Sequence, residues 1–164
     1  MMHKQAQLIQ KAWLAGQSLS ALPGVEVSRL SGVGSHALPM MSHSVAAGFP
    51  SPADDHVEAR ISLDETLVEH PDATFYLRVK GDSMVGADIH DNDVLVVDRA
   101  IEPRHGHIVV AVLDGELTVK TLQITPVGVR LVAANEHYPA IEVREAQELV
   151  IWGVVLWTIK RAPR

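Results

Sequence analysis

Short apolar runs separated by turn residues dominate the second half of the chain. They span residues 74–79, 94–97, 108–113, 116–124, 128–133 and 149–159. Runs of this length, separated by glycine, proline, aspartate and asparagine, are typical of an all-β sandwich or a folded sheet. Asp114-Gly115 predicts a type I′ hairpin turn between two of the runs, because both central residues of that turn need positive φ. The pattern therefore predicts a mostly-β domain.

Two other stretches have helical spacing. Near the amino terminus, polar residues interrupt the apolar positions, which favours a helix over a signal peptide; these positions are Leu8, Ile9, Ala12 and Trp13. A second helix is predicted over residues 62–70, with Ser62 as its cap, Leu63 and Leu67 on one face, and Pro71 ending it.

Residues 14–53 form the least regular part of the sequence. They are rich in glycine, proline, serine and alanine, a composition that argues against a compact domain. We expect a flexible arm here, with a short strand near residues 25–30, and the composition changes at about Asp54. The alternative is a flexible tail without a function.

The composition of the chain limits the kinds of partner and the cellular location that we expect. The chain is 47% hydrophobic but only 4% aromatic, so its core must be mainly aliphatic. With 14 basic and 20 acidic residues the net charge is −6, which argues against direct binding of DNA through a basic surface and favours a protein or peptide partner. The sequence contains no cysteine, and no apolar run is long enough to span a membrane. These features predict a cytoplasmic protein without a membrane contact.

The candidate chemistry begins with Gly81-Asp82-Ser83-Met84, which lies in a loop between two predicted strands. A serine at an exposed bend can act as a nucleophile when neighbouring backbone N–H groups point at the developing oxyanion. Ordinary turn chemistry is the alternative for these residues.

Lys120 follows Ser83 by 37 positions. Strand alternation places it on the same face as Leu122 and Ile124. Burial among apolar side chains would lower the pKa of the lysine, as a general base near neutral pH requires. The alternative is a solvated lysine on an edge strand.

Three other kinds of site are possible in this sequence. The segment 105–107, His-Gly-His, lacks a third metal ligand at a characteristic spacing, so a polar turn is favoured. A Ser-His-Asp triad would need Ser83, a histidine and either Asp93 or Asp98. The acidic segment 91–93 lacks the rest of a calcium loop. We therefore expect neither a metal nor another cofactor.

Several motifs in order make the chain resemble the UmuD family and, more broadly, the LexA-like self-cleaving serine peptidases of the S24 group. The resemblance runs from about Leu38 to the carboxyl terminus. Its motifs are Gly48-Phe49-Pro50-Ser51-Pro52-Ala53, Gly81-Asp82-Ser83-Met84 with Ile89 and Asp93, Asp98, His105-Gly106-His107-Ile108-Val109, Asp114 to Lys120, and Gly153-Val154-Val155.

The resemblance implies a LexA/UmuD-like, signal-peptidase-like folded β-sheet domain over residues 48–164, preceded by a removable arm, residues 1–47. It implies Ser83 as nucleophile, Lys120 as general base and Ala47-Gly48 as the scissile bond. We expect the backbone N–H groups of Asp82 and Ser83 to be the oxyanion donors. In this family, a RecA filament on single-stranded DNA stimulates the cut during the SOS response. The product forms a homodimer and joins a UmuC-like subunit in an error-prone translesion polymerase.

One departure and two alternatives accompany the resemblance. The family's arm is about half as long as the 47 residues before the expected cut, and residues 1–37 have no counterpart. A LexA-type repressor would need a DNA-binding domain, which this broken segment does not supply. A non-catalytic dimerising partner of a polymerase would need neither Ser83 nor Lys120, and both are present.

Overall fold

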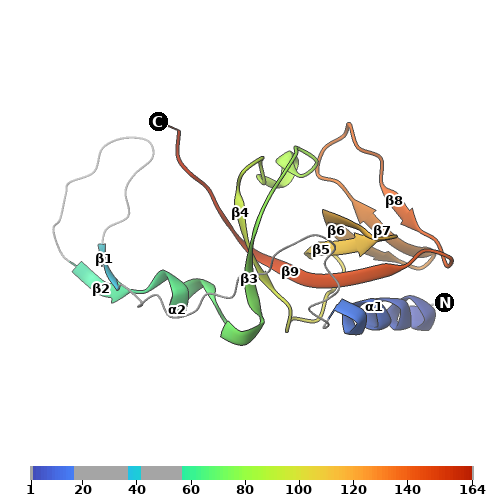
Figure 1. Ribbon diagram of the computed structural model, residues 1–164, viewed down its shortest axis with the longest axis horizontal. Coiled ribbons are helices and arrows are strands. Elements are labelled where there is room, and N and C mark those ends of the chain that lie inside the picture. Colours follow the sequence, from blue (N-terminus) through green and yellow to red (C-terminus); the bar gives the residue numbers. More distant parts are fainter. Residues whose placement is uncertain (1, 17–36, 42–56, 164) are drawn as a thin grey trace.

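The computed structural model describes residues 2–16, 37–41 and 57–163. Its centre is a seven-stranded sheet with the strand order β3-β4-β9-β5-β6-β7-β8, in which every neighbouring pair is antiparallel (Figure 1). The strands are β3 (Thr74–Arg78), β4 (Val94–Asp98), β5 (Ile108–Leu113), β6 (Glu116–Thr125), β7 (Gly128–Val132), β8 (Ile141–Val143) and β9 (Leu149–Ile159).

The six predicted apolar runs all form strands, and the mostly-β prediction is confirmed. The Asp114-Gly115 turn joins β5 to β6 with φ of 50° and 86° at its two residues, as a type I′ turn requires. Sequence reasoning missed β8, because three residues with an exposed glutamate in the middle give almost no alternation to detect.

Both faces of the central sheet are buried. Along β5, Val109 and Ala111 face one hydrophobic cluster while Val110 and Val112 face the other. The long strand β9 joins the two halves of the sheet, since it pairs with β4 and with β5. Gly153 permits this crossing, because a Cβ there would lie 2.6 Å from a methyl carbon of the Val97 side chain.

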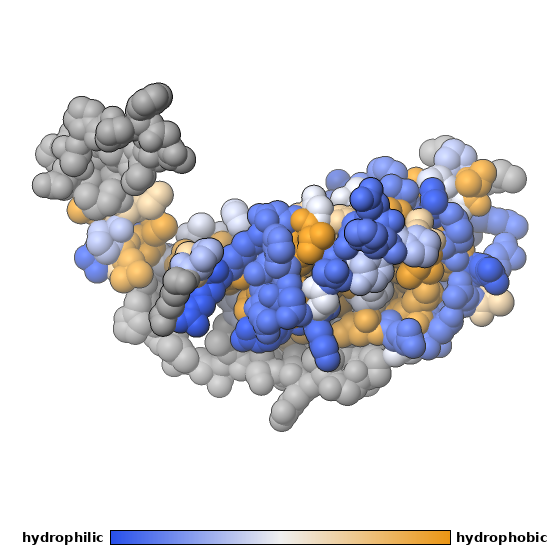
Figure 2. Space-filling model, turned by 90° about the horizontal axis from the view of Figure 1, so that it is seen from above, coloured by the Kyte–Doolittle hydropathy of each residue, from blue (hydrophilic) through white to orange (hydrophobic). Residues whose placement is uncertain are grey.

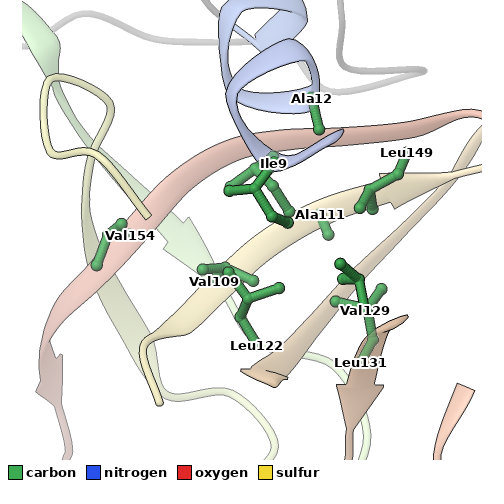
Figure 3. Packing of buried hydrophobic residues seen from close by; sticks show 10 residues of the cluster. Ile9, Ala12, Val109, Ala111, Leu122, Val129, Leu131, Leu149 and Val154 are labelled. Atoms are coloured by element: carbon green, nitrogen blue, oxygen red, sulfur yellow. The ribbon is translucent and has the colours of Figure 1, made fainter. Parts of the chain in front are cut away.

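Helix α1 (Met2–Gly16) covers one of these faces (Figure 1). Its Ile9 and Ala12 are buried in the cluster with Val109, Leu122 and Leu131 (Figure 3). The predicted amino-terminal helix is therefore confirmed. Its packing on the sheet differs from the flexible arm expected over residues 1–47, and it arises because Leu8, Ile9 and Ala12 contact the same hydrophobic cluster.

The helix predicted over residues 62–70 is shorter than expected. Helix α2 (Leu63–Leu67) ends at Val68, whose backbone is extended, and a separate 3-10 turn, η2 (Pro71–Ala73), follows. Leu63 is 58% exposed, so the apolar face of α2 has little to pack against. Without such packing a short helix has little support, and the Ser62 side chain makes no capping hydrogen bond. No helix in the described ranges has the length and apolar character needed to cross a membrane.

A separate two-stranded sheet joins β1 (Leu38–Met41) to β2 (Val57–Ile61). Hydrophobic side chains on it are exposed (Figure 2), namely Leu38, Met40 and Val57. The register places residue 41 opposite residue 57, so the strands bracket residues 42–56. That segment contains Ala47 and Gly48 and the predicted domain boundary, all of which lie outside the described residues, as does the strand expected near residues 25–30.

Candidate active site

The nucleophile loop, residues 81–88, is part of the connection between β3 and β4 and carries Ser83. Gly81 begins it with φ of 95°, a left-handed conformation that glycine adopts without strain, and its N–H donates to Asp91 Oδ1 at 2.7 Å. The 3-10 turn η3 (Val85–Ala87) follows Ser83, and the side chain of Met84 is buried in the core. Ser83 therefore lies between two fixed points of the loop.

The structure brings Ser83 and Lys120 together. The Nζ atom of Lys120 lies 2.8 Å from Ser83 Oγ, although 37 positions separate the two residues. Lys120 belongs to β6, where it faces Val109 of β5 in the strand register. Pairing of β6 within the sheet thus fixes the base, while the nucleophile loop supplies the hydroxyl.

Lys120 is buried, which decides between the two alternatives that the sequence left open. Its exposed fraction is 7%, and β6 lies between β5 and β7, so the alternative of a solvated lysine on an edge strand is wrong. Burial lowers the pKa of Lys120 by disfavouring the charged form. The lower pKa makes the neutral form of Lys120, which can accept a proton as a general base, easier to reach near neutral pH.

The partners of Nζ define how a neutral Lys120 would orient. Thr118 Oγ1 and the Val119 carbonyl oxygen each lie 2.9 Å from Nζ and can accept its hydrogens. A neutral amine has two N–H bonds and one lone pair. With both N–H bonds directed at these two oxygens, the lone pair faces Ser83 Oγ, where it can accept the hydroxyl proton.

A solvent-accessible cleft gives access to this pair. Residues 78–81, after β3, line one side and residues 117–119, at the start of β6, line the other, with Ser83 and Met84 between them. The cleft is open at the surface, and its walls carry the positive charges of Arg78 and Lys80. An extended peptide segment could therefore reach Ser83 from solvent.

The backbone around Ser83 offers donors for an oxyanion. Among the described residues, the N–H groups of Asp82 and Ser83 are not used in a hydrogen bond to another protein group. Free donors at a nucleophile are what a tetrahedral intermediate requires. The two oxyanion donors expected from sequence thus remain available.

The two acidic residues considered for a triad are used elsewhere. Asp98 Oδ2 lies 2.7 Å from Nδ1 of His70, and Asp93 Oδ2 accepts the His90 N–H at 2.8 Å. Within the described part of the chain, no histidine lines the cleft at Ser83. The geometry therefore favours the Ser-Lys pair over a triad.

The residues considered as metal ligands hold turns together. His105 Nδ1 accepts the Ile124 N–H at 3.0 Å, and His107 Nδ1 accepts the Arg104 N–H at 3.1 Å. Over the described ranges, histidines and carboxylates form no group of three that could hold a metal ion.

Sequence reasoning missed two residues that contact the nucleophile loop. Asn135 Nδ2 donates to the Asp82 carbonyl oxygen at 3.0 Å, and the Tyr138 hydroxyl donates to the Asp82 carboxylate. Both residues follow β7, more than 50 positions from Asp82. Their segment has no periodic pattern or glycine-rich motif that could have indicated this contact.

The chain is similar in sequence to a known family and to several known proteins. A family model described as Peptidase S24-like matches residues 39–156. The chain is similar to Protein MucA of Salmonella typhimurium, with 43% identity over 129 residues, covering 78% of the chain and 88% of that protein. It is also similar to Protein ImpA of Shigella flexneri, with 40% identity over 80% of the chain and 89% of that protein. For the LexA repressor of Alcanivorax borkumensis, identity is 39%, over 77% of the chain and 61% of the repressor.

Proposed function

Because the chain belongs to the peptidase S24-like family, and its relatives MucA and ImpA are UmuD-family proteins, we propose that it is a self-cleaving serine peptidase of the SOS response. The observation that carries the proposal is the 2.8 Å separation between Ser83 Oγ and Lys120 Nζ in a buried setting. A hydroxyl beside a desolvated amine is a nucleophile with its base in place.

Neutral Lys120 takes the hydroxyl proton as Ser83 Oγ attacks the carbonyl carbon of Ala47. The N–H groups of Asp82 and Ser83 stabilise the oxyanion that forms. Collapse of the intermediate breaks the Ala47-Gly48 bond; the proton passes from Lys120 to the leaving amine of Gly48, and Ala47 is left as an ester on Ser83. Lys120 then takes a proton from water as the water oxygen attacks the ester carbonyl, and returns that proton to Ser83 Oγ as the ester bond breaks, which releases the carboxyl group of Ala47 and restores the serine.

The choice of Ala47-Gly48 rests on sequence and on strand pairing. These small residues precede Phe49-Pro50, the family motif, and a strand-like segment with small side chains suits a narrow cleft. The pairing of β1 with β2 brackets the segment that contains the bond. Cleavage there would separate residues 1–47 from residues 48–164.

The cellular role of the protein is inferred from its similarity to MucA and ImpA. We infer that a RecA filament on single-stranded DNA stimulates the cut in the cytoplasm, and that the shortened homodimer joins a UmuC-like polymerase subunit. The net charge of −6 fits protein partners better than direct contact with DNA. Sequence identity supports this role over that of a repressor, because it is 43% to MucA and 39% to the LexA repressor.

Incubation of the purified full-length protein over a range of alkaline pH, followed by intact mass spectrometry, tests the peptidase. Deprotonation of Lys120 should produce fragments 1–47 and 48–164 without an activator. Ser83→Ala should remain intact, and Lys120→Arg should too, because a guanidinium stays charged. An intact wild-type protein at every pH would favour the alternative of a non-catalytic dimerising partner. Fragments from Ser83→Ala would exclude the mechanism.

The SOS role has a separate test at neutral pH. RecA with single-stranded DNA and a nucleotide should accelerate the same cut, whereas RecA without DNA should not. Cleavage in alkali without a response to the filament would retain the peptidase and contradict the SOS assignment.

A further inference from the structure

A second loop holds the peptide bond that precedes the nucleophile. This clamp loop, residues 134–138, follows β7 and reaches the nucleophile loop through two side chains. Asn135 Nδ2 donates to the Asp82 carbonyl oxygen at 3.0 Å, and the Tyr138 hydroxyl donates to the carboxylate of the same residue. Asp82 is thus bound through both its main chain and its side chain.

The orientation of the Asn135 amide is determined by its two partners. Its Oδ1 atom accepts the His137 N–H at 3.0 Å. A backbone N–H only donates and a backbone carbonyl only accepts. Oδ1 must therefore face His137 and Nδ2 must face Asp82, because the flipped amide would lose both hydrogen bonds.

Fixing the Asp82 carbonyl also fixes the N–H of Ser83. The two groups belong to one planar peptide unit, which is trans like every peptide bond among the described residues. In a trans unit the carbonyl and the N–H point to opposite sides. The Val85 N–H also donates to this carbonyl, at 3.3 Å, so two donors hold the carbonyl and the Ser83 N–H points to the opposite side of the peptide unit.

The same clamp loop also holds the residues that follow Ser83. The Ala134 carbonyl accepts the Gly86 N–H at 2.6 Å, and the Ala134 N–H donates to the sulfur of Met84 at 3.4 Å. The chain on both sides of Ser83 is therefore attached to one loop. A nucleophile held on both sides keeps its hydroxyl and its N–H in one relative geometry.

We propose that Asn135 is a positioning residue for the peptidase: it holds the Asp82 carbonyl so that the Ser83 N–H points at the oxyanion, with Tyr138 supporting the same residue. The inference rests on the proposed self-cleavage. The hydrogen bond from Tyr138 to Asp82 raises the pKa of the Tyr138 hydroxyl. This donor therefore stays protonated while alkali deprotonates Lys120.

The test is the rate of self-cleavage of full-length protein as a function of pH, which gives a plateau rate and a midpoint. Asn135→Ala should lower the plateau about 10- to 100-fold, since misplacement of a catalytic donor has effects of that order. The midpoint should not move, because Lys120 does not contact Asn135. Tyr138→Phe should lower the plateau by a smaller factor.

Matched variants control for the loss of side chains in general. Gln147→Ala removes another loop amide that donates one hydrogen bond, in this case to Asp114, and should leave the profile unchanged. Tyr76→Phe removes a hydroxyl from β3 and should do the same. Asn135→Asp keeps the shape of the side chain but presents an oxygen to the Asp82 carbonyl, and it should lose as much activity as Asn135→Ala.

Three results would overturn the proposal. The first is an unchanged plateau in Asn135→Ala, and the second is full activity in Asn135→Asp. The third is a midpoint that rises toward the value of an exposed lysine, because this would mean that the variant merely admits water to Lys120. A wild-type protein that never cleaves would instead contradict the proposed function, so the two failures are distinguishable.

Discussion

Nδ1 of His70 lies 2.7 Å from Oδ2 of Asp98, a carboxylate with no exposed surface. The other carboxylate oxygen accepts the Ala100 N–H at 2.7 Å. Through this contact the segment that follows α2 is attached to the carboxyl end of β4. Its strength depends on the charge of the imidazole, because a histidinium binds a carboxylate more strongly than a neutral ring does.

The first prediction concerns pH and His70. Its hydrogen bond to Asp98 raises the pKa of His70, so its contribution to stability is complete below the pKa of the unfolded chain. That contribution is lost as pH rises through the higher folded pKa. Between about pH 6 and pH 8, the melting temperature of the wild type should fall more than that of His70→Gln. Equal slopes in thermal unfolding, measured with Ser83→Ala as the background, would contradict this.

The second prediction concerns the stability cost of Lys120. Burial lowers its pKa, so the charged form destabilises the folded protein at neutral pH, and the penalty is relieved as pH rises through the folded pKa. Lys120→Met should therefore raise the free energy of unfolding by about 1 kcal/mol near pH 7. The gain over a Ser83→Ala control should shrink as pH rises from the lowered folded pKa of Lys120 toward the ordinary lysine value of about 10.4. A gain that does not vary with pH would show that packing, rather than charge, is responsible.

The third prediction concerns the contact between the nucleophile loop and the clamp loop. A Cβ at Gly86 would lie 2.5 Å from the Ala134 carbonyl oxygen, and this oxygen belongs to the backbone, so it cannot move aside as a flexible side chain could. Gly86→Ala should therefore lower the free energy of unfolding by about 2 kcal/mol and slow self-cleavage. In Gly128→Ala the new methyl group meets nothing within 4 Å, so stability and cleavage should stay near wild type. Denaturant titration and the pH-rate profile measure both quantities.

The fourth prediction concerns the docking of α1. Ile9 is 4% exposed and contacts the core cluster, whereas Leu14 on the same helix is 58% exposed. Ile9→Ala should destabilise the protein by about 2 kcal/mol and make α1 more sensitive to limited proteolysis. Leu14→Ala should have little effect. If both variants behave like wild type, the helix does not pack on the sheet in solution.

Sequence pattern predicted the strands well because turn residues separate most of the runs. The turn at Asp114-Gly115 is the clearest case, since its two positive φ angles follow from local residues alone. The helix at Leu63–Leu67 was predicted to be too long, because the length of a helix depends on packing, which a local sequence pattern does not contain.

The site was only partly predictable for the same reason. Ser83 and Lys120 could be selected as candidates from residue type and alternation, and the family motif connected them. Their separation of 2.8 Å depends on the whole sheet, which places the start of β6 beside the nucleophile loop. Asn135 and Tyr138 act through contacts across the chain from an irregular segment, where no local rule identifies a partner.

The packing of α1 has a consequence for what a cut would release. The helix precedes Ala47-Gly48 but packs on strands that follow it, so an intact chain supplies α1 to the sheet at a high effective concentration. Once the chain is severed, the same contact becomes an association between two molecules, and dilution determines how much of it survives. Cleavage and separation are therefore distinct events, and the time for which α1 remains bound sets the delay between them.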